Sequence, residues 1–224
     1  MIKHIFDLVF SSFYKPIDAF IEKPWEKQLQ TFNYILAHGR RTYFGEKNNF
    51  SQIKTPEDFK KHVPIMGYDD LKPYLDIIIN ERKSNVLWDT PVKWFAMSSG
   101  TTNDKSKYIP VTKESLKNCL YRGGYHMLAL YAKHFPENRY MLGKSLVLGG
   151  SQQVNTIGQG IFTGDISAVL VKNLPWWAKR RRTPEEISLI PEWDLKLQQL
   201  TDYAINKDIR SFVGVPSWML VLLK

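Results

Sequence analysis

Apolar residues at helical spacing dominate the first 90 residues of the chain. Residues 1–38 are expected to be helical, with Pro24 suited to the first turn of a helix that carries Leu29, Phe32 and Ile35 on one side. Gly39 is a plausible end of that helix. A loop is expected to follow over residues 40–45.

Two shorter helices are expected next. Thr55 is a natural N-cap because Pro56 and acidic residues follow it, and Val63 with Pro64 would end this helix. A third helix is expected over 69–80, where apolar residues recur on one face. Pro73 fits only near the start of that helix.

The pattern changes to strands at 92–97 and again at 108–111, which predicts two neighbouring strands joined by a hairpin-like turn. Thr112 is then a natural N-cap for a long helix that extends to about His134. A short buried strand is expected at 144–148. Residues 151–165 are rich in Gly, Gln, Asn and Thr, and this composition favours a functional loop.

The last third of the chain is expected to hold helices and one strand. An apolar segment over 166–174 ends at Pro175. The remaining elements are predicted as helices at 184–189 and 192–206, a strand at 211–213 and an apolar helix over 218–223. The chain stops inside this apolar helix, without a cap or polar tail, which favours a truncated domain.

Composition is that of a globular protein, with 43% apolar and 24% charged residues. A formal charge of +9 favours anionic partners. The one dense basic cluster, residues 179–182, is typical of a solvated face, and without an aromatic and basic RNA-binding pattern we expect no nucleic-acid partner.

Location and metal chemistry are constrained by a few residue types. Cys119 is the single cysteine, which excludes a disulfide framework and favours a reducing cytoplasm. The five histidines lack metal-ligand spacing, so no protein-held metal is expected. No signal peptide is predicted, and no apolar run reaches the roughly 18 residues of a membrane span.

The strongest chemical signal is a cluster of small and hydroxylated residues between the two predicted strands. Ser98, Ser99, Gly100, Thr101 and Thr102 follow a strand-like run, and Lys107 comes shortly afterwards. Small residues let backbone N–H groups converge on an anion, hydroxyls add neutral donors, and lysine adds a mobile charge. The pattern therefore indicates a phosphate-binding loop, although a simple polar turn has the same composition.

Other nucleotide-binding motifs do not fit. A Walker-type loop needs a glycine five residues before Gly143, where Asn138 stands, and the predicted order there is helix then strand. Gly158, Gly160 and Gly164 have the wrong spacing for a dinucleotide fingerprint.

The flanks of the hydroxyl cluster carry a family resemblance. Val63, Pro64 and Ile65 precede the run Tyr68 to Tyr74, which reads YDDLKPY, and the cluster, Lys107 and Pro110 follow in order. This order resembles the acyl-acid amido synthetases of the plant auxin-responsive (Gretchen Hagen) family and their bacterial relatives, which are adenylate-forming enzymes. The resemblance extends over the whole chain.

The resemblance implies an α/β fold, with a mixed β-sheet flanked by helices and a helical N-terminal segment. On this interpretation residues 1–90 are a mainly helical segment packed on the same domain, and 91–224 form an α/β subdomain with the phosphate loop. The rest of the large domain, the small domain and their adenine, ribose and Mg-binding motifs would lie beyond residue 224. The 224-residue chain alone is then expected to be inactive or nearly so.

The resemblance also implies roles for residues. Ser98, Ser99, Gly100, Thr101, Thr102 and Lys107 would hold the β- and γ-phosphates of Mg-ATP. Asp104 adds a negative charge beside that position. A carboxylic acid would be activated as acyl-adenylate and passed to an amine, typically an amino acid, without a covalent nucleophile on the protein.

The acid pocket is expected near two apolar segments and one histidine. The candidate residues are His126, Val169, Leu170, Val215, Pro216 and Trp218. Packing in the protein core is the alternative interpretation of each. At the level of function, two alternatives stay open: an acyl-CoA-forming relative, and a non-catalytic interaction protein with the same fold.

Overall fold

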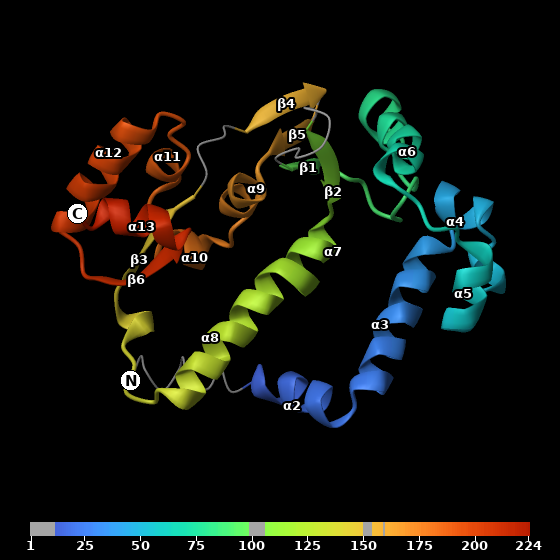
Figure 1. Cartoon of the computed structure of the whole chain (residues 1–224), viewed down its shortest axis with the longest axis horizontal. Helices are drawn as coiled ribbons and strands as arrows, with labels where there is room; N and C mark the ends of the chain where they lie inside the picture. The colour runs from blue at the N-terminus through green and yellow to red at the C-terminus, as the bar shows by residue number, and fades with distance from the viewer. Residues whose placement is uncertain (1–11, 99–105, 150–153, 159) are drawn as a thin grey trace.

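The computed structural model describes residues 12–98, 106–149, 154–158 and 160–224. Two small β-sheets lie beside each other, and helices surround them (Figure 1). The expected α/β fold, with a mixed sheet flanked by helices, is confirmed. The division at residue 90 stays a prediction.

The N-terminal helices are α2 (Tyr14–Glu22) and α3 (Pro24–Gly39), as expected. The loop expected at 40–45 is wrong, because a short helix α4 (Tyr43–Lys47) begins there. Thr42 explains this helix: its buried hydroxyl donates to Gly39 O at 2.7 Å and accepts from Gly45 N at 3.0 Å. A side-chain cap of this kind satisfies backbone groups that the turn would otherwise leave unpaired.

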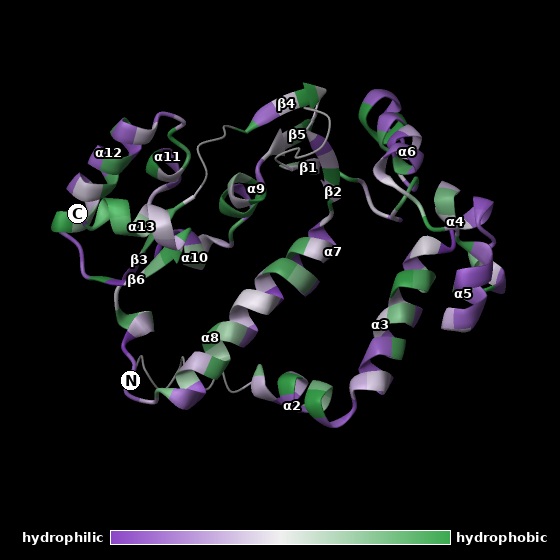
Figure 2. Ribbon diagram, in the orientation of Figure 1, coloured by the Kyte–Doolittle hydropathy of each residue, from purple (hydrophilic) through white to green (hydrophobic). Residues whose placement is uncertain are grey.

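Two capped helices follow α4. A 3-10 turn, η1 (Phe50–Gln52), leads to α5 (Pro56–His62). Thr55 is the N-cap, as the sequence predicts, and it forms a reciprocal capping box with Asp58 at 3.0 and 3.1 Å. Helix α6 (Tyr68–Glu81) then begins at Gly67, whose N–H donates to Asp70. Figure 2 shows the exposed helix α5 coloured mainly as polar.

The first sheet has the strand order β2-β1-β5-β4. Its strands are β1 (Trp94–Ser98), β2 (Lys107–Val111), β4 (Asn155–Gly158) and β5 (Ile161–Gly164). β1 pairs antiparallel with β2, as expected for the hairpin, and parallel with β5. The loop expected over 151–165 is therefore wrong at 155–158 and 161–164, which form the antiparallel pair β4 and β5.

Helices cover both faces of this sheet. Phe95 is fully buried against Leu75 and Ile78 of α6. The next residue, Ala96, points to the opposite face and packs against Val169 of helix α9 (Ile166–Lys172). The alternation along β1 follows from the two-residue period of a strand. Burial on both faces holds the end of β1 in place.

The long helix expected after Thr112 is confirmed, with an irregular middle. Thr112 and Ser115 cap each other at 3.0 Å. The helix is continued by α7 (Lys113–Ser115), a π-helical turn η2 (Leu116–Tyr121) and α8 (Arg122–His134). π-Helical turns are rare and concentrate at functional sites.

The second sheet pairs β3 (Lys144–Leu148) in parallel with β6 (Ile209–Gly214). Its core contains Leu146, Leu148, Leu200 and Met219. The surrounding helices and turns are η3 (Tyr140–Leu142), α10 (Trp176–Lys179), α11 (Glu185–Ser188), α12 (Trp193–Ile205) and α13 (Pro216–Leu222).

The two edges of the second sheet differ. Ser145 donates its N–H to Arg181 O at 2.7 Å and accepts from Thr183 N at 3.1 Å. The Thr183 hydroxyl accepts from Val147 N at 2.8 Å, so the β3 edge is covered. Within the described ranges, β6 pairs with no strand other than β3. Phe212 and Val213 of β6 remain 48% and 36% exposed.

Candidate functional site

The two residues that flank the predicted phosphate loop, Ser98 and Lys107, are held opposite each other by strand pairing. We call this pair the neck of the loop. Ser98 is the last residue of β1 and stands opposite Lys107, the first residue of β2. Both side chains are half-buried. Ser99, Gly100, Thr101 and Thr102 lie outside the described residues. The strands thus bring one hydroxyl and one ammonium group to the two ends of the segment, a donor set that suits a phosphate.

Helix α6 fixes the Lys107 side of this neck. Tyr68, in its first turn, accepts a hydrogen bond from Tyr108 N at 2.9 Å. β2 is an edge strand, so this hydroxyl satisfies an N–H that has no strand to pair with. The ammonium of Lys107 lies 5.5 Å from the centroid of the Tyr68 ring. Tyr68 therefore contacts both the backbone of β2 and the ammonium group of Lys107, just after the loop.

Ser98, Val215 and Pro216, three of the predicted site residues, lie at the carboxyl ends of parallel strands. β1 ends at Ser98 and its parallel neighbour β5 ends at Gly164. β6 ends at Gly214, which precedes Val215 and Pro216. In open α/β sheets ligands bind outside this edge. The topology therefore places Ser98, the first residue of the hydroxyl cluster, where a ligand is expected.

A buried lysine links the ends of the two sheets. Lys196 of α12 is fully buried, and its Nζ lies 3.4 Å from Gly149 O at the end of β3. Burial lowers the pKa of Lys196, and the charge of Asp165, just after β5, acts in the opposite direction. A lysine on an amphipathic helix is expected to be solvated, and its burial beside the Gly149 carbonyl could not be predicted from the helical pattern.

Asp165 has a second role as the N-cap of α9. Its carboxylate accepts from Ala168 N at 2.7 Å and from Ser167 Oγ at 2.6 Å. Ser167 Oγ in turn lies where a side chain on Gly149 would come within 3.0 Å, so α9 and the end of β3 approach closely. These contacts set the start of the helix that carries Val169 and Leu170.

Val169 and Leu170 lie beneath the first sheet. Val169 is fully buried, and Leu170 packs against the same cluster. Leu170 O accepts from the hydroxyl of Tyr121 at 3.1 Å, and burial raises the pKa of Tyr121 to about 12. Tyr121 belongs to the π-helical turn, so that turn is fixed to α9.

The other candidates for the acid pocket lie in different surroundings. Trp218 packs with Trp193 in the core of the second sheet, their ring centroids 5.5 Å apart, whereas Val215 and Pro216 are exposed. His126 faces Phe13 at a ring separation of 6.2 Å. The structure therefore groups Val169 with Leu170 and does not place Trp218 in the same cluster.

His126 has an unusual environment for a histidine. Its Nε2 is buried and has no hydrogen-bond partner among the described residues. Burial lowers the pKa of His126, and the positive charge of Arg122 adds to the effect. The neutral imidazole is therefore favoured, and its Nε2 is available to a polar group of a ligand.

The described part of the chain offers neither a metal-binding cluster nor a membrane-spanning helix. Among the described residues, no three His, Cys, Asp or Glu side chains gather closely enough to bind a metal ion. Cys119 is exposed. In the same part of the chain, no helix is both long and apolar enough to span a membrane.

Comparison with known proteins identifies the family. Residues 13–213 match the model described as the GH3 family N-terminal domain. The chain belongs to the GH3 family. The resemblance carried by the hydroxyl cluster and its flanks is confirmed.

GH3 relatives agree with this assignment in sequence. Indole-3-acetic acid-amido synthetase GH3.15 of Arabidopsis thaliana is 35% identical over 166 residues, which are 71% of this chain and 27% of that protein. The 4-substituted benzoates-glutamate ligase GH3.12 of the same plant is 40% identical over 65 residues, 29% of this chain and 11% of that protein. Jasmonoyl--L-amino acid synthetase JAR6 of Nicotiana attenuata is 30% identical over 93 residues, 42% and 16% of the two chains.

Solved structures agree in fold. The GH3.15 acyl acid amido synthetase superposes with a TM-score of 0.69 at 22% identity, over 88% of this chain and 35% of that chain. The structure of AtGH3.15 in complex with 2,4-DB gives the same TM-score at 24% identity. This GH3 chain thus spans about a third of the length of these relatives, or less.

Proposed function

We propose that this chain is the phosphate-binding, N-terminal part of an ATP-dependent ligase that conjugates a carboxylic acid to an amino acid through an acyl-adenylate. The observation that carries the proposal is the hairpin neck, where Ser98 and Lys107 flank the hydroxyl cluster at the carboxyl end of β1. Membership of a family whose named relatives are amido synthetases supports the same conclusion.

The reaction needs little covalent chemistry from the protein. A carboxylate oxygen attacks the α-phosphorus of ATP, and the bond to the bridging oxygen breaks and releases pyrophosphate. The amine then attacks the acyl carbon, and AMP leaves. Ser98, Ser99, Gly100, Thr101, Thr102 and Lys107 would orient the β- and γ-phosphates and stabilise the negative charge that gathers on pyrophosphate as it leaves.

Lys107 is positioned for this role. Its ammonium rests against the Tyr68 ring, an attraction worth about 0.5–1 kcal/mol at exposed sites. A charge-assisted bond to phosphate is worth more, about 1.5–3 kcal/mol. The lysine can therefore leave the ring when the nucleotide binds. Mg²⁺ would enter bound to the phosphates, since the described residues offer it no cluster of carboxylates.

The acid would bind beyond the strand ends. Val169 and Leu170 pack close to β1, Val215 and Pro216 follow the end of β6, and Trp218 lies in α13. His126 adds a neutral ring nitrogen with no partner among the described residues. These residues remain our candidates for the acid pocket, in an enzyme that we place in the cytoplasm.

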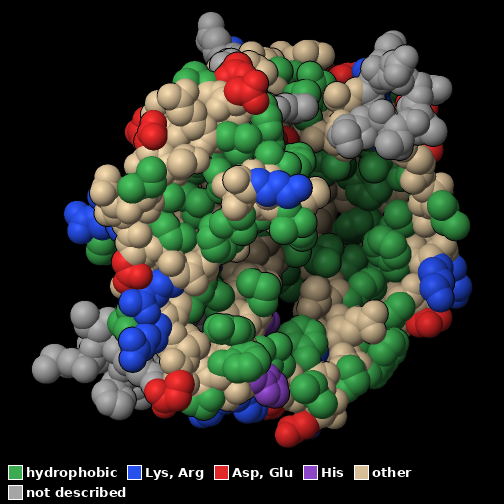
Figure 3. Space-filling model, turned by 60° about the vertical axis from the view of Figure 1, so that its left-hand side comes forward, with side chains coloured by type: hydrophobic (Ala, Val, Ile, Leu, Met, Phe, Trp, Pro, Cys, Tyr) green, Lys and Arg blue, Asp and Glu red, His purple; other side chains and the backbone are tan. Residues whose placement is uncertain are grey.

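The exposed apolar surface supports a larger assembly. Figure 3 shows a hollow on one face of the molecule with hydrophobic side chains gathered in it. Phe212, Val215, Leu220 and Leu223 are 43% to 64% exposed around the unpaired side of β6 and on α13. We propose that a C-terminal region, as in the longer relatives, covers these residues. The 224 residues alone are then expected to be inactive.

A chimaera tests the proposed function. The chain is joined to the C-terminal two thirds of Arabidopsis GH3.15, and exchange of labelled pyrophosphate into ATP is measured with a panel of carboxylic acids. We expect acid-dependent exchange, and its loss on Ser99→Ala or Thr101→Ala. Ser106→Ala is the matched control, because it also removes a hydroxyl near the neck. Exchange that survives both loop substitutions would exclude this site.

A further inference from the structure

Lys196 of α12 is a buried cation to which the proposed reaction gives no task. Its exposed fraction is 0%, and among the described residues no other charged side chain is buried to this extent. Lysine is almost never fully buried unless it is paired, because removing the ammonium group from water costs free energy. The groups around Lys196 therefore have to explain its position.

The Lys196 ammonium lies where α12, the end of β3 and the start of α9 come together. Its Nζ is 3.4 Å from Gly149 O, directly after β3. Burial lowers the pKa of Lys196, and the negative charge of Asp165, directly after β5, opposes this effect. Asp165 in turn accepts from Ala168 N and Ser167 Oγ in the first turn of α9. A Cβ on Gly149 would lie 3.0 Å from Ser167 Oγ, so β3 and α9 approach closely here.

Each of these two segments leads to a different part of the expected acid pocket. β3 and β6 are parallel neighbours that end at the same level, so Gly149 and Val215 leave the second sheet side by side. Helix α9 carries Val169 and Leu170, which pack close to β1 of the first sheet. Lys196 thus lies between the groups that position the two apolar segments.

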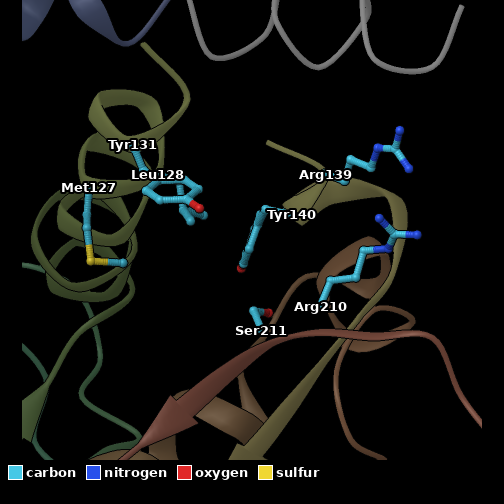
Figure 4. A pocket seen from close by; sticks show the side chains of 7 residues that line it. All are labelled: Met127, Leu128, Tyr131, Arg139, Tyr140, Arg210 and Ser211. Atoms are coloured by element: carbon cyan, nitrogen blue, oxygen red, sulfur yellow. The ribbon is translucent and has the colours of Figure 1, made fainter. Parts of the chain in front are cut away.

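The opposite end of the second sheet is separate from this arrangement. A pocket of about 490 Å³ lies there, between α8 and the beginning of β6. Figure 4 shows the side chains that line it: Met127, Leu128, Tyr131, Arg139, Tyr140, Arg210 and Ser211. Arg210 is the second residue of β6, so this pocket lies roughly 16 Å along the strand from Val215. The acid site expected at the carboxyl ends of the strands therefore depends on the end of the sheet that Lys196 contacts.

We propose that Lys196 is a positioning residue for the acid substrate: its ammonium group holds the start of α9 against the end of β3, and so sets the distance between segments 169–170 and 215–216. This inference rests on the proposed function, because the acid pocket is placed at those two segments. Pocket dimensions select substrates by size, and one methylene in an apolar pocket changes kcat/KM by about 10- to 200-fold. Lys196 therefore contributes to the choice of acid without touching it.

The first test measures which acid the enzyme prefers. The chimaera with Arabidopsis GH3.15 is assayed by pyrophosphate exchange with benzoate, phenylacetate and 3-phenylpropanoate, a series that grows by one methylene at each step. We expect Lys196→Met to change the ratio of kcat/KM between two of these acids by at least about fivefold, with the KM for ATP unchanged. This ratio does not depend on how much of the enzyme is folded, so a merely structural loss would not change it. Lys207→Met removes an exposed lysine just after the same helix and should keep the wild-type ratio.

Asp165→Asn tests the same interaction from the other side and does not require a change inside α12. Asparagine still caps a helix through its amide oxygen, so α9 should keep its start while the charge that acts on Lys196 is lost. We expect the acid ratio to change in the same direction as in Lys196→Met. The double variant should change the ratio no more than the larger single effect, because both substitutions break one interaction.

Hydrogen–deuterium exchange of the 224-residue chain separates this inference from the proposed function. We expect Lys196→Met to exchange faster than the wild type in both 144–149 and 165–172, with α3 unchanged. A wild-type chimaera that is inactive with every acid would count against the proposed function, and hydrogen exchange would still show whether Lys196 holds the two segments. The inference is overturned if either segment keeps its wild-type exchange rate, or if an active chimaera keeps its acid ratio in both Lys196→Met and Asp165→Asn.

Discussion

The hydrogen bond from Tyr108 N of β2 to the Tyr68 hydroxyl gives a quantitative prediction about the neck of the phosphate loop. Tyr68→Phe keeps the ring under Lys107 and removes the hydroxyl that accepts from Tyr108 N at 2.9 Å. Tyr108 is half-buried on an edge strand, so water replaces part of the lost bond. The net loss is then about 0.5–1.5 kcal/mol. For a chain of this size each kcal/mol lowers Tm by about 2–4 °C, so we expect a decrease of roughly 1–6 °C.

The assay is thermal unfolding followed by circular dichroism, with Tyr43→Phe as the control. Tyr43 is 46% exposed, and its hydroxyl has no hydrogen-bond partner among the described residues. This control should unfold at the wild-type temperature. Tyr68→Ala should lower Tm further than Tyr68→Phe, because it also removes the ring that contacts Lys107. If Tyr68→Phe unfolds at the same temperature as the wild type and the control, the Tyr68 hydroxyl does not stabilise β2 and the argument for the neck fails.

Three further substitutions test local features of the fold by chemical or thermal unfolding. Gly45→Ala should destabilise the fold by several kcal/mol, because its new Cβ would lie 1.9 Å from Gly39 O. Gly123→Ala, with open space around it in α8, should instead stabilise the fold by about 1 kcal/mol. Equal effects of the two substitutions would contradict the packing of α4. Thr55→Ala should lower the free energy of unfolding by about 1 kcal/mol through loss of the capping box, and an unchanged value would show that the box contributes nothing. Burial lowers the pKa of Lys196, so at alkaline pH the unfolded chain binds more protons than the folded chain. The free energy of unfolding should therefore rise as pH increases from the folded-state pKa toward the ordinary lysine value. Lys196→Met should abolish that rise, and a pH profile identical to that of the wild type would contradict the burial.

Local signals in the sequence predict much of the fold. Thr55 and Thr112 each precede a partner that can reach back to the cap, and both helices start where these signals place them. The β1–β2 hairpin is also local, since its strands are separated by a short segment rich in turn residues. Such elements need no knowledge of the rest of the chain.

Non-local pairing explains what sequence reasoning missed. The segment 155–164 is rich in Gly, Asn and Thr, residues that favour loops. β5 nevertheless gains its strand structure by pairing in parallel with β1, 68 residues earlier, as in the pair Trp94 and Phe162. Burial on both sides of the sheet outweighs the local preference. Sequence periodicity could not reveal this partner.

The same limit applies to the site. Ser98 and Lys107 are brought together by a local hairpin, so the neck of the phosphate loop can be predicted. Lys196 and Asp165 meet only because two sheets pack side by side, and the buried lysine contradicts the usual preference of its residue type.

The central claim is that the segment between β1 and β2 binds the polyphosphate of ATP. The most direct measurement is a crystal structure of the chimaera with Arabidopsis GH3.15 bound to a non-hydrolysable ATP analogue. We predict that the β- and γ-phosphates lie within hydrogen-bond distance of residues 98–102, and that Lys107 has left the Tyr68 ring to contact them. Phosphates bound elsewhere, with Lys107 still against that ring, would contradict the account.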